Sequence, residues 1–370
     1  MIATRINYDM LNYLPDTMET IQGQDILLND FGKGAFSMII VEDMEPKDVS
    51  ALKEKIEAVD HVDSVIWYDS IADISIPMDI LPDKIKDAFN TDHSTVMAVF
   101  FDTSTSADET MEAINTIRDV TNNQCFVSGM SAMVTDLKNL CEQEEPIYVA
   151  IAVVLAVVVM MLFMDSFLIP IIFLVSIGMA ILYNLGSNYF LGEISYITKA
   201  LSAILQLGVT MDYSIFLWHS YNEQKVRFDG DKERAMAHAI SNSIISVASS
   251  SITTIAGFLS MCFMSFTLGA DLGIVMAKGV VFGLIACVTI LPSLILVFDK
   301  AIEKTRHKQL MPKFDKVAKF ITKRSWIFLI IFAVLIGPAV YGYNNTQKYY
   351  DLSQTMPQDM DFVIANTKLK

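Results

Sequence analysis

Six apolar segments, each close to the length of a bilayer crossing, constrain the fold of this chain more than any other feature of its sequence. A helix needs about 20 mostly apolar residues to span the hydrocarbon core of a membrane. The sequence therefore predicts an α-helical integral membrane bundle of six transmembrane helices. Their predicted bounds are Ile147–Met164, Phe167–Leu191, Ile194–Tyr221, Asn242–Thr267, Leu272–Phe298 and Ser325–Asn345.

Charge divides the chain into an acidic first part and a mildly basic second part. Residues 1–146 carry 9 Lys/Arg against 28 Asp/Glu, and residues 147–370 carry 18 against 14. Binding to nucleic acid needs a positive surface, so the acidic first part argues against that class of partner. Hydrophobic residues make up 53% of the chain, which indicates a membrane protein with a soluble domain and argues against a globular enzyme.

The acidic part, residues 1–146, is predicted to form a separate α+β domain. Apolar strand patterns and amphipathic helices alternate along it as two β-α-β units, which favours a ferredoxin-like sandwich with helices on one face of the sheet. The sequence shows no nucleophile–base pair, phosphate loop or metal-ligand cluster here, so no catalytic or metal site is predicted. The predicted strands are Ala35–Glu42, Val62–Ile71, Thr95–Asp102 and Gln124–Ser128, and the predicted helices are Pro46–Val59, Ile80–Asn90, Ala107–Asn122 and Met130–Glu144.

The connections between the apolar segments differ in charge, and this difference predicts the orientation. Residues 222–241 carry four basic side chains and residues 299–324 carry nine, whereas residues 192–193 and 268–271 carry none. The positive-inside rule places the two basic connections in the cytoplasm. Counting crossings then makes residues 1–146 and 346–370 extracytoplasmic in a multi-pass protein of the cell membrane. Between them lie a five-helix bundle (147–298), a basic interfacial segment (299–324) and one more transmembrane helix (325–345).

A motif near the start of the chain recurs near its end. Tyr8-Asp9-Met10, Leu14-Pro15 and Met18-Glu19 match Tyr350-Asp351-Leu352, Met356-Pro357 and Met360-Asp361, at a constant offset of 342 residues. The second copy directly follows an apolar segment, so the first copy is expected to follow an equivalent helix. The chain is therefore predicted to be the first repeat of a two-repeat transporter that lacks its first transmembrane helix here.

One carboxylic acid, Asp212, lies about halfway along the apolar segment Ile194–Tyr221. An acid at this depth costs about 2.5–3.5 kcal/mol on insertion scales, so it normally faces the protein interior and marks an ion or substrate path. Tyr213 follows it and adds a hydroxyl that can donate or accept a hydrogen bond. Asp212 and Tyr213 are therefore the main candidate site, and Asp212 is expected to be buried.

Three motifs resemble the MMPL family of the RND superfamily. The segment Gly208-Val209-Thr210-Met211-Asp212-Tyr213-Ser214-Ile215-Phe216-Leu217 is similar to the fourth transmembrane helix of that family. The segment Ser249-Ser250-Ser251-Ile252-Thr253-Thr254-Ile255-Ala256-Gly257-Phe258 and the opening Tyr8-Asp9…Leu14-Pro15 are similar to it too. The resemblance implies a porter-type extracytoplasmic domain, a bundle related by pseudo-twofold symmetry to a second one, and export of lipidic or amphiphilic molecules driven by proton entry. It makes Asp212 the proton carrier and Tyr213 its hydrogen-bonding partner.

The sequence departs from the family at the cytoplasmic end of this helix, where Ser220 precedes the aromatic Tyr221 and members commonly have Arg. His219 lies seven residues after Asp212 and is either a proton exit step or an interfacial histidine. The hydroxyls after residue 242 either line a water path beside Asp212 or serve close helix packing. The candidate polar path is Ser246, Ser250, Thr253 and His219, and the candidate packing positions are Gly208, Gly257, Gly279 and Gly283.

The function predicted from these features is proton-coupled export of lipidic or amphiphilic substrates across the cell membrane. The proton gradient is the energy source, and no cofactor is predicted. The expected partners are membrane lipids, the substrate, and either a second repeat of the same polypeptide or another copy of the chain. Two alternatives remain: a lipid-sensing scaffold that does not transport, and a protein-export accessory subunit of the same architecture.

Overall fold

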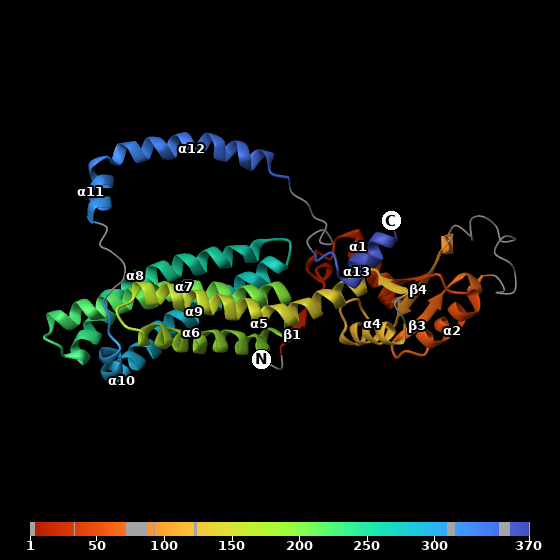
Figure 1. Ribbon diagram of the computed structural model, residues 1–370, viewed down its shortest axis with the longest axis horizontal. Coiled ribbons are helices and arrows are strands. Elements are labelled where there is room, and N and C mark those ends of the chain that lie inside the picture. Colours follow the sequence, from red (N-terminus) through yellow and green to blue (C-terminus); the bar gives the residue numbers. More distant parts are fainter. Residues whose placement is uncertain are drawn as a thin grey trace.

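The computed structural model describes residues 4–32, 34–71, 88–91, 93–121, 124–308, 315–347 and 356–369. An α/β unit lies at one end of an elongated helical bundle (Figure 1). Within the described residues, six helical segments are long and apolar enough to cross a membrane, which confirms the predicted number. Their bounds are Met130–Phe163, Leu168–Leu191, Tyr196–Arg227, Lys232–Phe263, Leu268–Lys304 and Ser325–Asn345.

The α/β unit contains a four-stranded sheet in which every neighbouring pair of strands is antiparallel and the spatial order is β3-β4-β2-β5. The prediction placed all four strands correctly, although the second ends at Ile66 because a 3₁₀ turn, η2 (Tyr68–Ser70), follows. The predicted helix Ile80–Asn90 lies largely outside the described residues. The elements are β2 (Phe36–Glu42), α2 (Pro46–Glu57), β3 (Val62–Ile66), β4 (Ser94–Phe101), α4 (Asp108–Val120) and β5 (Cys125–Ser128).

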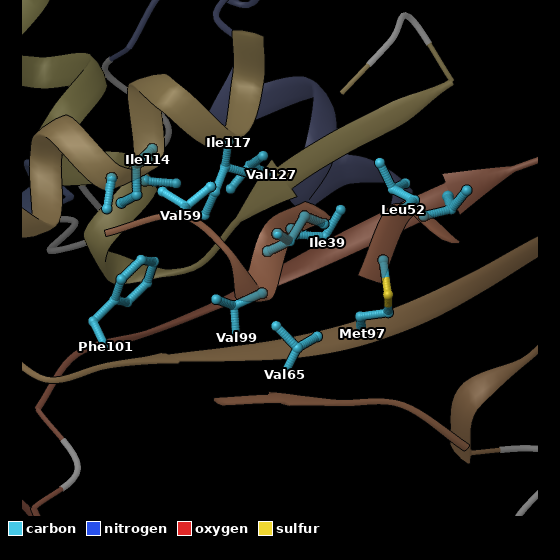
Figure 2. Packing of buried hydrophobic residues seen from close by; sticks show 14 of the residues in the cluster. Ile39, Leu52, Val59, Val65, Met97, Val99, Phe101, Ile114, Ile117 and Val127 are labelled. Atoms are coloured by element: carbon cyan, nitrogen blue, oxygen red, sulfur yellow. The ribbon is translucent and has the colours of Figure 1, made fainter. Parts of the chain in front are cut away.

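Strand alternation builds the core of this unit. Successive side chains of a strand point to opposite faces, and in β4 the residues Met97, Val99 and Phe101 are fully buried while their neighbours are partly exposed. Apolar side chains of α2 and α4, such as Leu52 and Ile114, pack against this face (Figure 2). The two helices therefore cover one face of the sheet, as predicted.

Two short helices of the α/β unit follow the two copies of the repeated motif. Helix α1 (Glu19–Asn29) and helix α13 (Asp361–Lys368) start at positions 342 residues apart, which equals the offset of the motif. Each follows a matching turn, in which the amide of Met18 donates to the carbonyl of Pro15 and that of Met360 to Pro357. The motif thus encodes the same turn and helix start twice. Residues 348–355 of the second copy lie outside the described part.

The bundle consists of long helices, several of which extend beyond their predicted ends. Helix α5 continues without interruption from the sheet into the bundle and contains Pro146, although two separate helices were predicted there. The predicted helix Leu272–Phe298 is in fact two helices that meet at Thr289, because Pro292 has no N–H to continue the helical ladder and fits only a first turn. The elements are α5 (Met130–Phe163), α6 (Leu168–Ser187), α7 (Tyr196–Arg227), α8 (Lys232–Ser260), α9 (Leu268–Val288) and α10 (Ile290–Lys304).

The α/β unit is joined to one end of the bundle, called here the sheet-proximal end. Strand β1 (Arg5–Asn7) pairs in parallel with β6 (Glu193–Ser195), which lies between α6 and α7. The amide of Thr267, just before α9, donates to the carbonyl of Tyr13 at 2.9 Å. The α7–α8 turn and α10 lie at the opposite, sheet-distal end (Figure 1). The two basic connections and the acidic unit are therefore at opposite ends of the bundle.

Helices α11 (Asp315–Lys323) and α12 (Ser325–Asn345) follow the bundle. Figure 1 draws α12 apart from the other long helices, and each of its 21 residues, all of which are described, is exposed or half-buried. Residues 299–304 of the predicted basic interfacial segment belong to α10, while residues 309–314 lie outside the described part.

Candidate functional site

Asp212 and Tyr213 lie midway along α7, and they point to different sides of it. The side chain of Ser195 caps this helix by accepting from the amide of Ile197, and Asp212 follows 16 residues after the helix start, about 24 Å along its axis. Consecutive helical residues are rotated by about 100°. Tyr213 consequently faces the bundle core with 6% of its surface exposed, whereas Asp212 is exposed on the adjacent side of α7.

A cavity of about 330 Å³ lies between α7 and α8 at this level and contains both residues. Two of the predicted polar-path residues, Ser246 and Ser250, line it from α8. The remaining lining residues are Val209, Phe216, Val247 and Thr254. The structure therefore brings Asp212, Tyr213, Ser246 and Ser250 together in one groove, which we call the Asp212 groove.

The other two polar-path candidates lie elsewhere. Thr253 does not line the groove, and its hydroxyl donates to the carbonyl of Ser249 at 3.0 Å. Its neighbour Thr254 lines the groove instead, because residues 246, 250 and 254 follow the i, i+4 ridge of α8. The sequence analysis named Thr253 as a polar-path candidate, and the structure places Thr254 in the groove. His219 is exposed on α7 but does not line the groove.

Asp212 is not buried within this chain, contrary to the expectation. The surface of α8 beside it is also polar and exposed at positions that include Ser246, Ser249 and Ser250. Apolar residues flank this strip, and Phe216 and Ile252 are 47% and 64% exposed. The hydroxyl of Tyr213 is buried without a hydrogen-bond partner among the described residues. The groove therefore presents a carboxylate and several aliphatic hydroxyls at the surface of α7 and α8, while the phenol of Tyr213 lies at its inner wall.

The four predicted glycines fall into two groups. A Cβ atom at Gly279 would lie 2.7 Å from Nδ2 of Asn184, and one at Gly283 would lie 2.5 Å from Oγ1 of Thr210. These two glycines of α9 therefore allow close approach to α6 and α7. At Gly208 and Gly257, no described atom beyond the adjoining residues of the same helix lies within 4 Å of the place that a Cβ atom would take, so a packing role for them remains a prediction.

Two ionic networks at the sheet-distal end have no counterpart among the predicted site residues. In the first, Asp165 accepts from Nε1 of Trp218 at 3.1 Å and pairs with Arg306 at 2.8 Å. In the second, Lys225 on α7 pairs with Asp299 at 2.7 Å and Glu303 at 2.9 Å, both on α10. These networks tie α7 to α10 and to the α5–α6 connection. No short-range sequence pattern indicates them, because each of these contacts joins residues that are more than 50 positions apart.

The apolar helices and the polar groove between two of them define the class of this protein. It is a multi-pass membrane protein with an α/β unit attached to one end of its helical bundle. The chain belongs to the MMPL family, whose profile it matches over residues 49–328.

Curated relatives agree with this assignment. Membrane protein MJ1562 of Methanocaldococcus jannaschii is 24% identical over 71% of this chain and 74% of the relative. The apo-petrobactin exporter of Bacillus anthracis is 22% identical over 94% of this chain and 52% of the exporter. The siderophore exporter MmpL5 of Mycobacterium tuberculosis is 25% identical over 54% of this chain and 22% of the exporter. The chain thus spans about half the length of the petrobactin exporter.

Proposed function

We propose that this chain is part of a proton-coupled exporter that moves amphiphilic or hydrophobic small molecules out across the cell membrane. The observation that carries the proposal is the carboxylate of Asp212 at mid-helix, in a groove that it shares with Tyr213 and two serines. Two relatives are exporters by name, and both names refer to siderophores or to petrobactin. We therefore infer that siderophore-like amphiphiles are the first cargo to test.

Asp212 is proposed to carry the proton and Tyr213 to hydrogen-bond to it. In a dry groove the neutral, protonated carboxyl is favoured, since an isolated charge in hydrocarbon is costly. When water enters the groove, the charged form becomes accessible and the proton can leave. A proton that enters the cell down the membrane potential releases about 2.3 kcal/mol of free energy per 100 mV. The change in charge of Asp212 then biases the arrangement of the helices around the groove.

The exposed polar strip on α7 and α8 supports a second helical bundle as the partner. A carboxylate facing lipid at this depth costs about 2.5–3.5 kcal/mol, and exposed hydroxyls at 246, 249, 250 and 253 would gain little from lipid chains. Small and hydroxyl-bearing residues are typical of contacts between transmembrane helices. We propose that a second repeat of the same polypeptide, or another copy of the chain, covers the Asp212 groove and completes the proton path.

The α/β unit is proposed to be a ferredoxin-like porter domain on the extracytoplasmic side. Its antiparallel order β3-β4-β2-β5, with α2 and α4 as crossovers, supports that fold. Its position opposite the basic α7–α8 turn supports the orientation. A mostly apolar cavity of about 590 Å³ under α1 includes Leu27, Phe36 and Met130 in its lining, which suits an amphiphilic cargo.

The test is export of a radiolabelled apo-siderophore from cells that produce the natural protein or variants of it. Asp212→Asn keeps the shape of the side chain but cannot exchange a proton, and we expect export to fall by about 100-fold or more, as on losing a positioned proton donor. Asp229→Asn, in the α7–α8 turn, is the matched control and should export like the wild type. Export by Asp212→Asn at the wild-type rate, with equal amounts of protein in the membrane, would overturn the proposal.

A further inference from the structure

Lys278 of α9 lies inside the bundle and away from the Asp212 groove. It follows the start of α9 by ten residues, about 15 Å along the helix axis, and it is half-buried. Its Nζ donates to Oδ1 of Asn188, at the sheet-proximal end of α6, at 2.5 Å. Among the described residues Lys278 forms no salt bridge with a carboxylate. Lys199 on α7, by contrast, pairs with Glu145 at 2.8 Å.

Three fully or almost fully buried amide side chains lie against this part of α9, and one of them, Asn188, accepts from the lysine. Asn184 of α6 and Asn188, which follows the last residue of α6, are 0% exposed, and Gln206 of α7 is 3% exposed. Nδ2 of Asn184 donates to Oε1 of Gln206 at 2.9 Å. Gly279, next to Lys278, allows this pair to approach the backbone of α9, since a methyl group there would lie 2.7 Å from Asn184 and 3.0 Å from Gln206. The amides of α6, of Asn188 and of α7 thus lie against two neighbouring positions of α9, Lys278 and Gly279.

Each of these amides retains one polar atom without a partner among the described residues: Asn184 Oδ1, Asn188 Nδ2 and Gln206 Nε2. Lysine can only donate, so the atom of Asn188 that faces it must be the oxygen, which leaves the amide nitrogen as a free donor. Exchanging nitrogen and oxygen in the Asn184–Gln206 pair would still leave one free donor and one free acceptor. Of the three polar atoms without a partner, two are therefore donors whichever way the pair is assigned.

We propose that Lys278, Asn188 and the Asn184–Gln206 pair form a binding site for a monovalent anion in the sheet-proximal half of the bundle. A half-buried cation without an acidic partner is unfavourable, and each buried polar atom without a hydrogen bond adds a further desolvation cost. An anion that accepts from Nζ of Lys278 and from the free amide nitrogens offsets both costs. Either a halide or the carboxylate of an amphiphilic molecule supplies this chemistry.

The anion site is independent of the proposed proton path. Its residues lie on the faces of α6, α7 and α9 that pack against each other, whereas Asp212 opens onto α8. Asp212→Asn should therefore abolish proton-coupled export and leave anion binding unchanged. Failure of the transport proposal and failure of the anion proposal are thus separate results.

The experiment is chlorine-35 NMR of chloride in the presence of the purified full-length protein in detergent. A bound, exchanging chloride broadens the signal, and we expect saturable broadening with the wild type. Asn188→Asp places a carboxylate beside Lys278 with almost no change in shape, and Lys278→Met removes the cation. Both variants should lose the saturable broadening. Lys199→Met and Asp212→Asn are the controls, and both should retain it.

Competition identifies the source of the anion. If acetate displaces chloride at a lower concentration than bromide does, the site binds carboxylates, and if bromide displaces it first, the site binds halides. Both results support an anion site. The proposal is overturned if the wild type shows no saturable broadening, or if broadening persists in both Asn188→Asp and Lys278→Met. Gel filtration and a thermal melt of each variant verify that a lost signal does not come from misfolding.

Discussion

At the scale of single residues, two aspartates of this chain have opposite environments. Asp212 is exposed in a groove, whereas Asp9 is 1% exposed at the joint between the α/β unit and the bundle. Oδ1 of Asp9 accepts from the amide of Leu11 at 2.8 Å, and Oδ2 is buried without a partner among the described residues. Burial raises the pKa of the Asp9 carboxyl above its usual 3.8, and the bond from Leu11 only partly opposes this.

This raised pKa predicts a pH-dependent loss of stability. The folded state holds the Asp9 proton more tightly than the unfolded state, so Asp9 disfavours folding increasingly as the pH rises above 3.8. The penalty becomes constant above the folded-state pKa. Asp9→Asn keeps an acceptor for Leu11 and removes the charge, so it should stabilise the protein at neutral pH.

The effect is measured by thermal melts of the wild type and of Asp9→Asn, recorded at about one-unit steps of pH from about pH 3 upward. The gap between the two melting temperatures should open with rising pH. Asp30→Asn, at an exposed position after α1, is the control and should show no such gap. A constant difference between Asp9→Asn and the wild type at every pH would contradict the assignment.

At the scale of elements, the glycines of α9 determine how closely it packs. A methyl group on Gly283 would have no space beside Thr210. A methyl group on Gly178 in α6 would meet no described atom within 4 Å beyond the adjoining residues of its own helix. Gly283→Ala should therefore destabilise the bundle by about 1–3 kcal/mol through overpacking. Gly178→Ala should be neutral or stabilising by up to about 1 kcal/mol, because alanine favours a helix. Melting temperatures in detergent compare the two variants, and an equal effect of both would refute the close approach of α9 to α7.

The positions of most elements could be predicted from the sequence, while several of their ends could not. Alternation of β-branched and aromatic residues located β2 and β4 because one face of each is buried. The length of each apolar segment located the membrane crossings. That length corresponds to the thickness of the bilayer core, and a helix can extend beyond it at either end. Helix α8 therefore starts ten residues before the predicted Asn242. Pro292 is a local sign of the helix break at Thr289. The continuous apolar pattern around it nevertheless led to the prediction of one helix.

The candidate site could be predicted only in part, again because a local pattern does not encode how helices pack. The mid-helix position of Asp212 is a property of one segment, and periodicity suffices to place Ser246 and Ser250 on one face of the next. Which face of α7 the bundle covers depends on how three other helices pack, and no local pattern encodes that. The same reason explains why Asn184, Asn188, Gln206 and Lys278 were not predicted to meet.

At the scale of the whole molecule, charge and architecture point to one orientation. The acidic α/β unit and the basic sheet-distal turn lie at opposite ends of the bundle (Figure 1). We therefore expect Asp60, in the α/β unit, outside the cell and Glu233, at the start of α8, inside it. Both side chains are exposed.

Cysteine labelling in intact cells tests this orientation. The four native cysteines (Cys125, Cys141, Cys262 and Cys287) are first replaced by serine, and Asp60→Cys or Glu233→Cys is then introduced. A membrane-impermeant maleimide should label Asp60→Cys in intact cells and Glu233→Cys only after the cells are opened. The reverse pattern would invert the proposed topology and place the α/β unit in the cytoplasm.

The central claim is that Asp212 gains and loses a proton as the exporter works, and infrared difference spectroscopy of the protein in lipid tests it most directly. Carbon-13 labelling of aspartate carboxyls assigns the bands, and Asp212→Asn identifies the one that belongs to Asp212. We predict a protonated-carboxyl band that appears on acidification of the outer side and disappears when cargo is exported. A band that stays unchanged through transport, or that is still present in Asp212→Asn, would contradict the claim.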